Sequence, residues 1–112
     1  MAEASLTNVT VVPAGEDTSN LAADCCHAVF MRRVYHHLSD AALINESLHT
    51  ALKPGGRLAI IEFRDDGWLG WVTGMGIGPN RLTDEVTAAG FRHIQTADWP
   101  GSYHYIVLFE RL

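Results

Sequence analysis

Two apolar stretches, separated by a segment with helical periodicity, constrain the fold of this sequence most strongly. His27–Val34 (HAVFMRRV) is nearly continuous in apolar residues until its polar end, and Arg57–Phe63 (RLAIIEF) has the same character. Such runs are typical of strands that are buried on both faces, as in a parallel sheet. Parallel neighbours need a crossover connection, which a helix between them supplies. We therefore predict an α/β fold.

The segment between the two stretches has the spacing of an amphipathic helix. Ser39 or Asp40 can cap its start, because a short polar side chain accepts a hydrogen bond from a free N–H of the first turn. Apolar side chains recur at helical spacing and are expected to face the sheet. They are Ala41, Ile44, Leu48, Ala51 and Leu52. The polar side chains expected on the outer face are Asn45, Glu46, His49 and Lys53.

A double glycine, Gly55-Gly56, lies between this helix and the second apolar stretch. A phosphate-binding glycine turn has the opposite order, with a strand before it and a helix N-terminus after it. Pro54 ends the helix because it has no N–H to donate, and the glycines permit the positive φ angles of a tight reversal. We interpret this loop as structural and not as a nucleotide site.

The flanking segments complete the expected organisation. Asn8–Gly15 is rich in β-branched residues and ends in Pro and Gly, which predicts a short strand. Residues 81–90 have helical spacing and end in a glycine that can cap the helix. Residues 91–99 and 102–112 are strand-like and flank a Pro-Gly turn, which predicts an antiparallel hairpin.

Composition excludes several classes of protein. The 112 residues predict one domain, residues 1–112, and the net charge of −5 with only eight Lys and Arg argues against nucleic-acid binding. No apolar run approaches the roughly 20 residues that span a bilayer, and the first residues lack the layout of a signal peptide. Adjacent Cys25 and Cys26 are not expected to bridge each other, because that geometry is strained. We therefore expect a reducing, cytoplasmic location.

Four stretches of the sequence carry a resemblance to a known family. They are VVPAGEDTSNL, HAVFMRRVYHHLSD, LHTALKPGGRLAIIEF and the closing AAGFRHIQ with YHYIVLFER. In this order they resemble the C-terminal part of a class I S-adenosylmethionine-dependent methyltransferase domain. The resemblance implies a partial Rossmann-like methyltransferase sheet, with parallel strands, flanking helices and a C-terminal antiparallel hairpin.

The resemblance also implies a cofactor and an activity. The cofactor is S-adenosylmethionine (SAM), and the activity is methyl transfer to a small-molecule acceptor. The family binds SAM with a glycine-rich turn after its first strand, followed by an acid that holds the ribose. No Gly-x-Gly turn directly follows a predicted strand here, so we expect weak or absent SAM binding by this chain alone. The alternative is a non-catalytic homologue that acts as a subunit or interaction protein.

Candidate cofactor-binding residues follow from the same resemblance. Glu16 and Asp17 come after the first predicted strand, where the family places an acid that accepts a hydrogen bond from the adenine amino group. The alternative for this pair is a solvated turn. Arg32, Arg33 and Val34 end a predicted strand, where open α/β sheets bind ligands, and the family uses this segment to line the methionine end of the cofactor.

The candidate catalytic residues are His36 and His37. Their unperturbed pKa of about 6.5 suits a general base, and the alternative is a backbone hydrogen bond and a helix cap. The histidines and cysteines show no metal-ligand spacing, so we predict no metal site.

The expected strand at His27–Val34 predicts association with another chain. In the family this strand pairs with the first strand of the domain, which has no counterpart in this sequence, and Asn8–Gly15 is expected to cover the free edge only partly. Exposed apolar edges pair with other chains, so we predict a two-fold homodimer or a partner chain. The irregular segment Arg64–Asn80, with Trp68 and Trp71, is expected to form a lid, to contact a partner or to pack over the helices.

Overall fold

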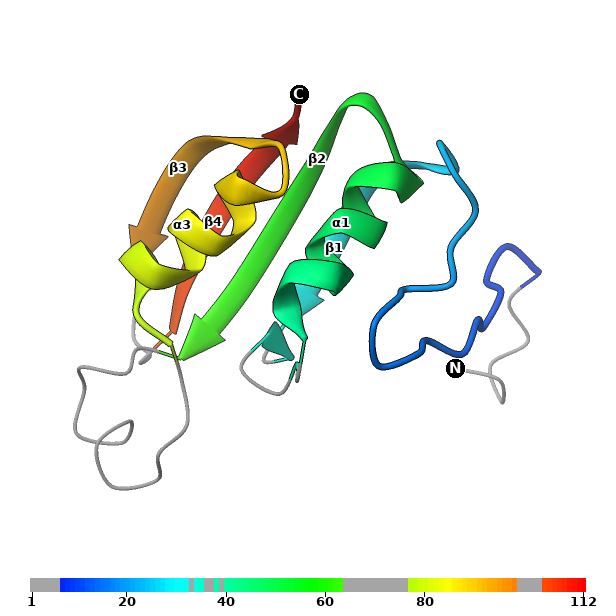
Figure 1. Cartoon of the computed structure of the whole chain (residues 1–112), viewed down its shortest axis with the longest axis horizontal. Coiled ribbons are helices and arrows are strands. Elements are labelled where there is room, and N and C mark those ends of the chain that lie inside the picture. The colour runs from blue at the N-terminus through cyan, green and yellow to red at the C-terminus, as the bar shows by residue number, and fades with distance from the viewer. Residues whose placement is uncertain (1–6, 33, 36–37, 39, 64–76, 99–103) are drawn as a thin grey trace.

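The computed structural model describes residues 7–32, 34–35, 38, 40–63, 77–98 and 104–112. Within these residues the chain forms one mixed sheet and two helices (Figure 1). The elements in chain order are β1 (Cys26–Arg32), α1 (Ala41–Ala51), β2 (Leu52–Phe63), α3 (Pro79–Ala88), β3 (Phe91–Asp98) and β4 (His104–Arg111).

The sheet has the order β1-β2-β4-β3. β1 and β2 are parallel and α1 connects them, which confirms the predicted crossover unit. β4 runs antiparallel to both β2 and β3, so the predicted C-terminal hairpin is also confirmed. The fold is therefore α/β, with parallel and antiparallel strands in one sheet.

The glycines predicted to form a loop between α1 and β2 lie within the first part of β2, where they have the expected structural role. Asp40 caps α1 by accepting a hydrogen bond from the Leu43 N–H at 3.3 Å. Beyond the other end of α1, Gly55 has a φ of +78°, a backbone angle that residues other than glycine rarely adopt. A Cβ on Gly56 would lie 2.8 Å from the Lys53 carbonyl oxygen, so the reversal excludes a larger residue there. β2 starts at Leu52, earlier than the sequence indicated.

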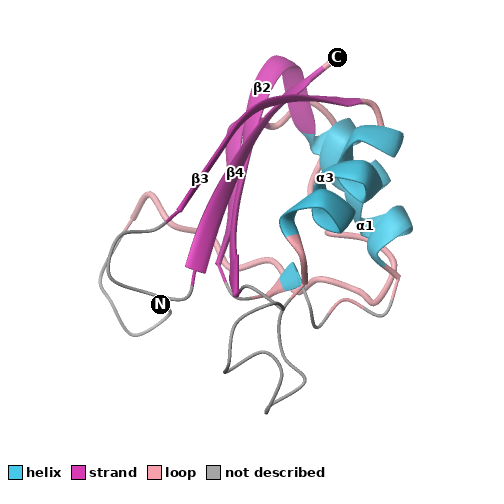
Figure 2. Ribbon diagram, turned by 90° about the vertical axis from the view of Figure 1, so that its left-hand side faces the viewer, coloured by secondary structure: helices cyan, strands magenta, loops and turns pink. Residues whose placement is uncertain are grey.

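Both helices cover the same face of the sheet, as the edge-on view shows (Figure 2). The apolar side chains of α1 and α3 meet those of the strands on this face and exclude water, which is the main source of stability. The core consists of Tyr35, Ile44, Leu48, Leu52, Leu58, Ile60, Ile77, Leu82, Val86, Phe91, Tyr105, Val107 and Phe109.

The prediction that β1 is buried on both faces is wrong. β1 lies at the edge of the sheet. Both helices lie on one face of the sheet (Figure 2), so neither covers the other face of this strand. Ala28, Phe30 and Arg32 are consequently exposed, and Phe30 has 61% of its surface accessible. Apolar composition therefore identified the strand correctly but misjudged its position.

The prediction of a strand at Asn8–Gly15 is also wrong. These residues have no regular secondary structure, and Val9, Val11 and Val12 are exposed. β-Branched residues favour a strand when a neighbouring strand and a packing face are present, and this segment has neither in the described part of the chain.

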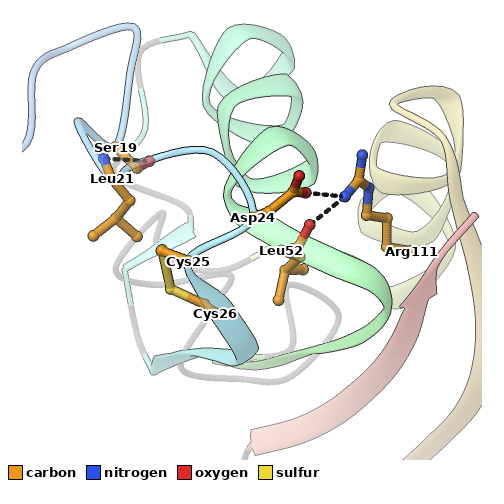
Figure 3. The surroundings of a disulfide bond; sticks show 7 residues. All are labelled: Ser19, Leu21, Asp24, Cys25, Cys26, Leu52 and Arg111. Carbon is orange, nitrogen blue, oxygen red and sulfur yellow. Dashed lines mark hydrogen bonds and ion pairs between the residues drawn. A yellow bond between two sulfur atoms is a disulfide. The ribbon is translucent and has the colours of Figure 1, made fainter.

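A third correction concerns the cysteines, because the structure has a disulfide between Cys25 and Cys26 (Figure 3). In a regular strand adjacent side chains point to opposite faces, which would keep the two sulfurs apart. Here Cys25 precedes β1, Asp24 has a left-handed φ of +53°, and the β1–β2 register shifts between Cys26 and Ala28. The irregular backbone allows the bridge.

Candidate functional site

An open pocket with a volume of about 550 Å³ lies beside the N-terminus of α1. Its lining consists of Glu16 and Asp17 from the segment before β1, together with Asp40 and Leu43 from the start of α1. The structure thus brings two of the predicted cofactor-binding residues to the N-terminal end of the crossover helix.

Hydrogen bonds hold the segment with Glu16 and Asp17 against α1. The Ser19 N–H donates to the Ser47 hydroxyl at 2.9 Å, and that hydroxyl donates to the Ile44 carbonyl at 2.8 Å. The Gly15 N–H donates to the Thr18 carbonyl at 2.9 Å and closes the turn that carries the two acids. Although the segment has no regular secondary structure, the Ser19–Ser47 hydrogen bond attaches it to α1.

The lining combines hydrogen-bond acceptors with one apolar side chain. Ionised carboxylates accept hydrogen bonds and donate none, so the three acids suit a ligand group that carries N–H or O–H donors. Leu43 is 41% exposed and offers an apolar surface beside them. This combination can receive a flat ring that bears a donor at its edge.

A buried polar network lies between β1 and the two helices. The Tyr35 hydroxyl donates to Glu85 Oε1 at 2.8 Å and accepts from Asn45 Nδ2 at 3.0 Å. Burial is the main reason that the pKa of the Tyr35 hydroxyl lies well above its usual value. The network therefore joins Tyr35, which lies after β1, to both α1 and α3.

The position of Asn45 corrects the sequence analysis, which placed it on the outer face of the helix. Asn45 is fully buried, and within the described part of the chain its Oδ1 has no hydrogen-bond partner. A signal for this was present, because Asn45 follows Ala41 by four residues and precedes Leu48 by three, and such residues share a helix face.

The other predicted site residues either lie away from this pocket or fall outside the described residues. Arg32 ends β1 and Val34 follows it, both are exposed, and neither contributes to the lining of the pocket beside α1. Arg33, His36 and His37 lie outside the described residues, as do Trp68 and Trp71, so the roles assigned to them stay predictions.

The described residues offer neither a cluster of metal ligands nor a helix suited to a membrane. In the ranges that the structure describes, no group of three or more His, Cys, Asp or Glu side chains is arranged to hold a metal ion. None of the helices in those ranges has the length and apolar character needed to cross a membrane.

Known proteins resemble this chain chiefly in structure. No protein-family model matches the sequence, and no curated protein matches it. Among solved structures, a SAM-dependent methyltransferase from Aquifex aeolicus superposes with a TM-score of 0.79 and is 26% identical. The superposition covers 96% of this chain and 57% of that one.

Two further structures have the same arrangement. A SAM-dependent methyltransferase from Thermotoga maritima, described as a possible histamine N-methyltransferase, has a TM-score of 0.78 at 14% identity and covers 93% of this chain and 65% of its own. A complex of the Haloferax volcanii Trm112 methyltransferase activator with a putative methyltransferase gives 0.74 at 12% identity, with coverage of 97% and 64%.

These comparisons confirm the predicted resemblance. The chain has the fold of a class I SAM-dependent methyltransferase, and it spans between 57% and 65% of the three solved chains.

Proposed function

We propose that this chain is methyltransferase-like in function as well as in fold, binding SAM and taking part in methyl transfer to a small-molecule acceptor. The observation that carries the proposal is the superposition of nearly the whole chain on the SAM-dependent enzyme from Aquifex aeolicus. The chain spans only part of that enzyme, so we further propose that SAM binding by this chain alone is weak.

The pocket beside α1 is the proposed site for the adenine ring. Glu16 and Asp17 would accept hydrogen bonds from the adenine amino group, and Leu43 would contact the face of the ring. The lining of the pocket fits the adenine ring, because it combines hydrogen-bond acceptors with an apolar surface. Arg32, Arg33 and Val34 are proposed to line the methionine end.

Bound SAM would supply an activated methyl group on a sulfonium. In an in-line displacement the bond from the acceptor to the methyl carbon forms as the bond from sulfur to carbon breaks, so the protein contributes mainly position. A hydroxyl or amine acceptor also loses a proton, and we propose His36 or His37 as the base that takes it.

Association with a second copy is the proposed assembly. β1 is an edge strand with exposed Ala28 and Phe30, and such an edge can add a strand from another chain. A two-fold arrangement would pair β1 with its own copy. The Haloferax volcanii complex supports a variant of this proposal, in which a different partner chain binds, and the non-catalytic alternative would need such a partner. A cytoplasmic location is also part of the proposal.

Titration calorimetry with S-adenosylhomocysteine tests the cofactor proposal. We expect binding with a Kd above about 100 μM. Replacing both acids, Glu16→Ala with Asp17→Ala, should weaken it by more than about 1 kcal/mol, because the adenine amine loses its acceptor. Asp84→Ala, an exposed acid on α3, is the matched control and should change nothing.

Three outcomes would contradict parts of the proposal. No binding of S-adenosylhomocysteine at its solubility limit would favour the non-catalytic alternative. Binding that the double variant leaves unchanged would return Glu16 and Asp17 to the role of a solvated turn. A Kd in the low micromolar range would overturn the expectation of weak binding and show that other residues replace the glycine turn.

A further inference from the structure

The Cys25–Cys26 disulfide lies where the N-terminal segment, residues 7–24, enters the sheet (Figure 3). Cys26 is the first residue of β1 and pairs with Leu52 of β2. Most of the N-terminal segment is exposed, whereas β2 belongs to the core of the sheet. The bridge therefore marks the boundary between a loosely packed part of the chain and a firmly packed one.

The residue before the bridge makes the contacts that hold this boundary. The Asp24 N–H donates to the Thr50 carbonyl at 2.9 Å, and its Oδ1 accepts from Arg111 Nη1 at 2.8 Å. Arg111 also donates to the Leu52 carbonyl (Figure 3). Asp24 thus joins the N-terminal segment to the end of α1 and to the end of β4, and Arg111 extends this connection to the start of β2.

The bridge is open to reagents from solution. Cys25 is exposed and Cys26 is partly buried. Exchange between thiols and disulfides proceeds by attack of a thiolate on a sulfur atom, so access to one sulfur is sufficient for the reaction to start. Exposed disulfides are also those that are reduced most readily.

We propose that Cys25 and Cys26 are a redox-active pair, converted between disulfide and dithiol by a reductant of the dithiol class, and that this conversion controls how firmly residues 7–24 are held against α1. A thiolate of the reductant attacks one sulfur of the pair and releases the other as a thiolate. The second thiol of the reductant then displaces the first cysteine. Two electrons pass to the protein, both cysteines end as thiols, and the reductant ends as a disulfide.

The mechanical consequence follows from the closed ring that the bridge makes of two adjacent residues. The ring restricts the backbone beside Asp24, which needs its left-handed φ of +53° to reach both Thr50 and Arg111. Opening the ring returns rotational freedom to this backbone, and the entropy gained favours states in which the Asp24 contacts are broken. The contact from Ser19 to Ser47, further along the same segment, is expected to loosen with them.

The pair also connects the structure with the expected cellular setting. Disulfides are rare where dithiol reductants are abundant, so a cytoplasmic protein would hold the pair mostly as thiols. The bridged form would then report oxidising conditions. The proposal concerns the junction itself and does not depend on the pocket being a cofactor site.

Hydrogen exchange of the whole chain in oxidised and dithiothreitol-reduced states tests this proposal. Reduction should add about 2 Da to the intact mass and make both cysteines available for alkylation. The amides of Ser19 and Asp24 should then exchange at least about threefold faster, because the contacts that protect them open more often. Amides of β2 and β4 serve as the internal reference and should not change.

A variant separates the redox effect from other effects of the reductant. The double variant Cys25→Ser with Cys26→Ser cannot form the bridge, so its Ser19 and Asp24 amides should exchange at the fast rate with and without dithiothreitol. The proposal is overturned if reduction produces no gain in mass and no alkylation. It is equally overturned if the reduced and oxidised chains exchange at the same rate at Ser19 and Asp24.

Discussion

Removing the Tyr35 hydroxyl should destabilise the protein through a neighbouring residue more than through Tyr35 itself. In Tyr35→Phe, Asn45 Nδ2 and Glu85 Oε1 both lose a hydrogen-bond partner. Glu85 is partly exposed and keeps its contact with Arg81 at 3.1 Å, so water can replace the lost donor. Asn45 is fully buried, and its Oδ1 already lacks a hydrogen-bond partner among the described residues, so the amide would lose its bond to Tyr35 without access to water.

The magnitude follows from the cost of an unsatisfied buried group. Leaving one such group without a partner costs about 1–3 kcal/mol, and we expect a loss of about 2 kcal/mol, nearly all of it at Asn45. Urea denaturation followed by circular dichroism measures this loss as a shift in midpoint at constant slope. Glu46→Gln, an exposed change on α1, is the control and should lie within about 0.5 kcal/mol of the parent.

A double-mutant cycle makes the reasoning refutable. Asn45→Leu has a similar branched shape and removes the polar atoms, so adding it to Tyr35→Phe should recover part of the lost stability. Additive losses in the double variant, or a loss below about 0.5 kcal/mol in Tyr35→Phe alone, would refute the assignment of the cost to Asn45.

The raised pKa of Tyr35 adds a dependence on pH. The folded state disfavours the phenolate, so the stabilising effect is fully present below the unfolded pKa of about 10 and is lost as the pH rises above it. The free energy of unfolding of the parent should therefore fall more steeply above about pH 10 than that of Tyr35→Phe.

Two further predictions concern the surface of the sheet. Light scattering at micromolar concentration should give twice the chain mass of 12.3 kDa, and a mass of 12.3 kDa would contradict the homodimer. Phe30→Lys should restore the mass of a single chain, whereas Val11→Lys in the exposed N-terminal segment should not. Glu110 accepts a hydrogen bond from Arg92, which lowers the pKa of the Glu110 carboxyl group in the folded protein. The ionised carboxylate therefore stabilises the fold above the ordinary pKa of a glutamate, and this stabilisation is lost as the pH falls through the lowered value. Glu110→Gln should flatten the acid side of the stability profile, and an unchanged profile would mean that solvent screens the pair completely.

The sequence predicted those parts of the fold that local chemistry determines. The apolar runs at β1 and β2 and the helical spacing of α1 each agree with the final structure because core packing favours the same elements that the local pattern favours. The turn at Gly55 was predictable for a similar reason, since few residues other than glycine adopt its φ.

The errors came from properties that depend on tertiary neighbours. Exposure of Phe30 depends on which face the helices cover, and the β-branched residues at 9–12 would have needed a partner strand. Burial of Asn45 depends on a hydrogen-bond acceptor for its amide, and that acceptor is the hydroxyl of Tyr35, a residue outside the helix. The pocket could be predicted only in part, because Asp40 was expected as a helix cap and nothing in the sequence placed it beside Glu16 and Asp17.

The strand order β1-β2-β4-β3 has a consequence for how the protein is made. β4 lies inside the sheet and pairs on both sides, yet it follows the other three strands in chain order. During synthesis β1 and β2 emerge first and can already form the crossover unit with α1, but the inner edge of β2 has no neighbour until residues 104–111 leave the ribosome. In that interval the growing chain exposes the apolar edge and face of β2. The risk of aggregation is therefore greatest before β4 has been synthesised and has paired with β2.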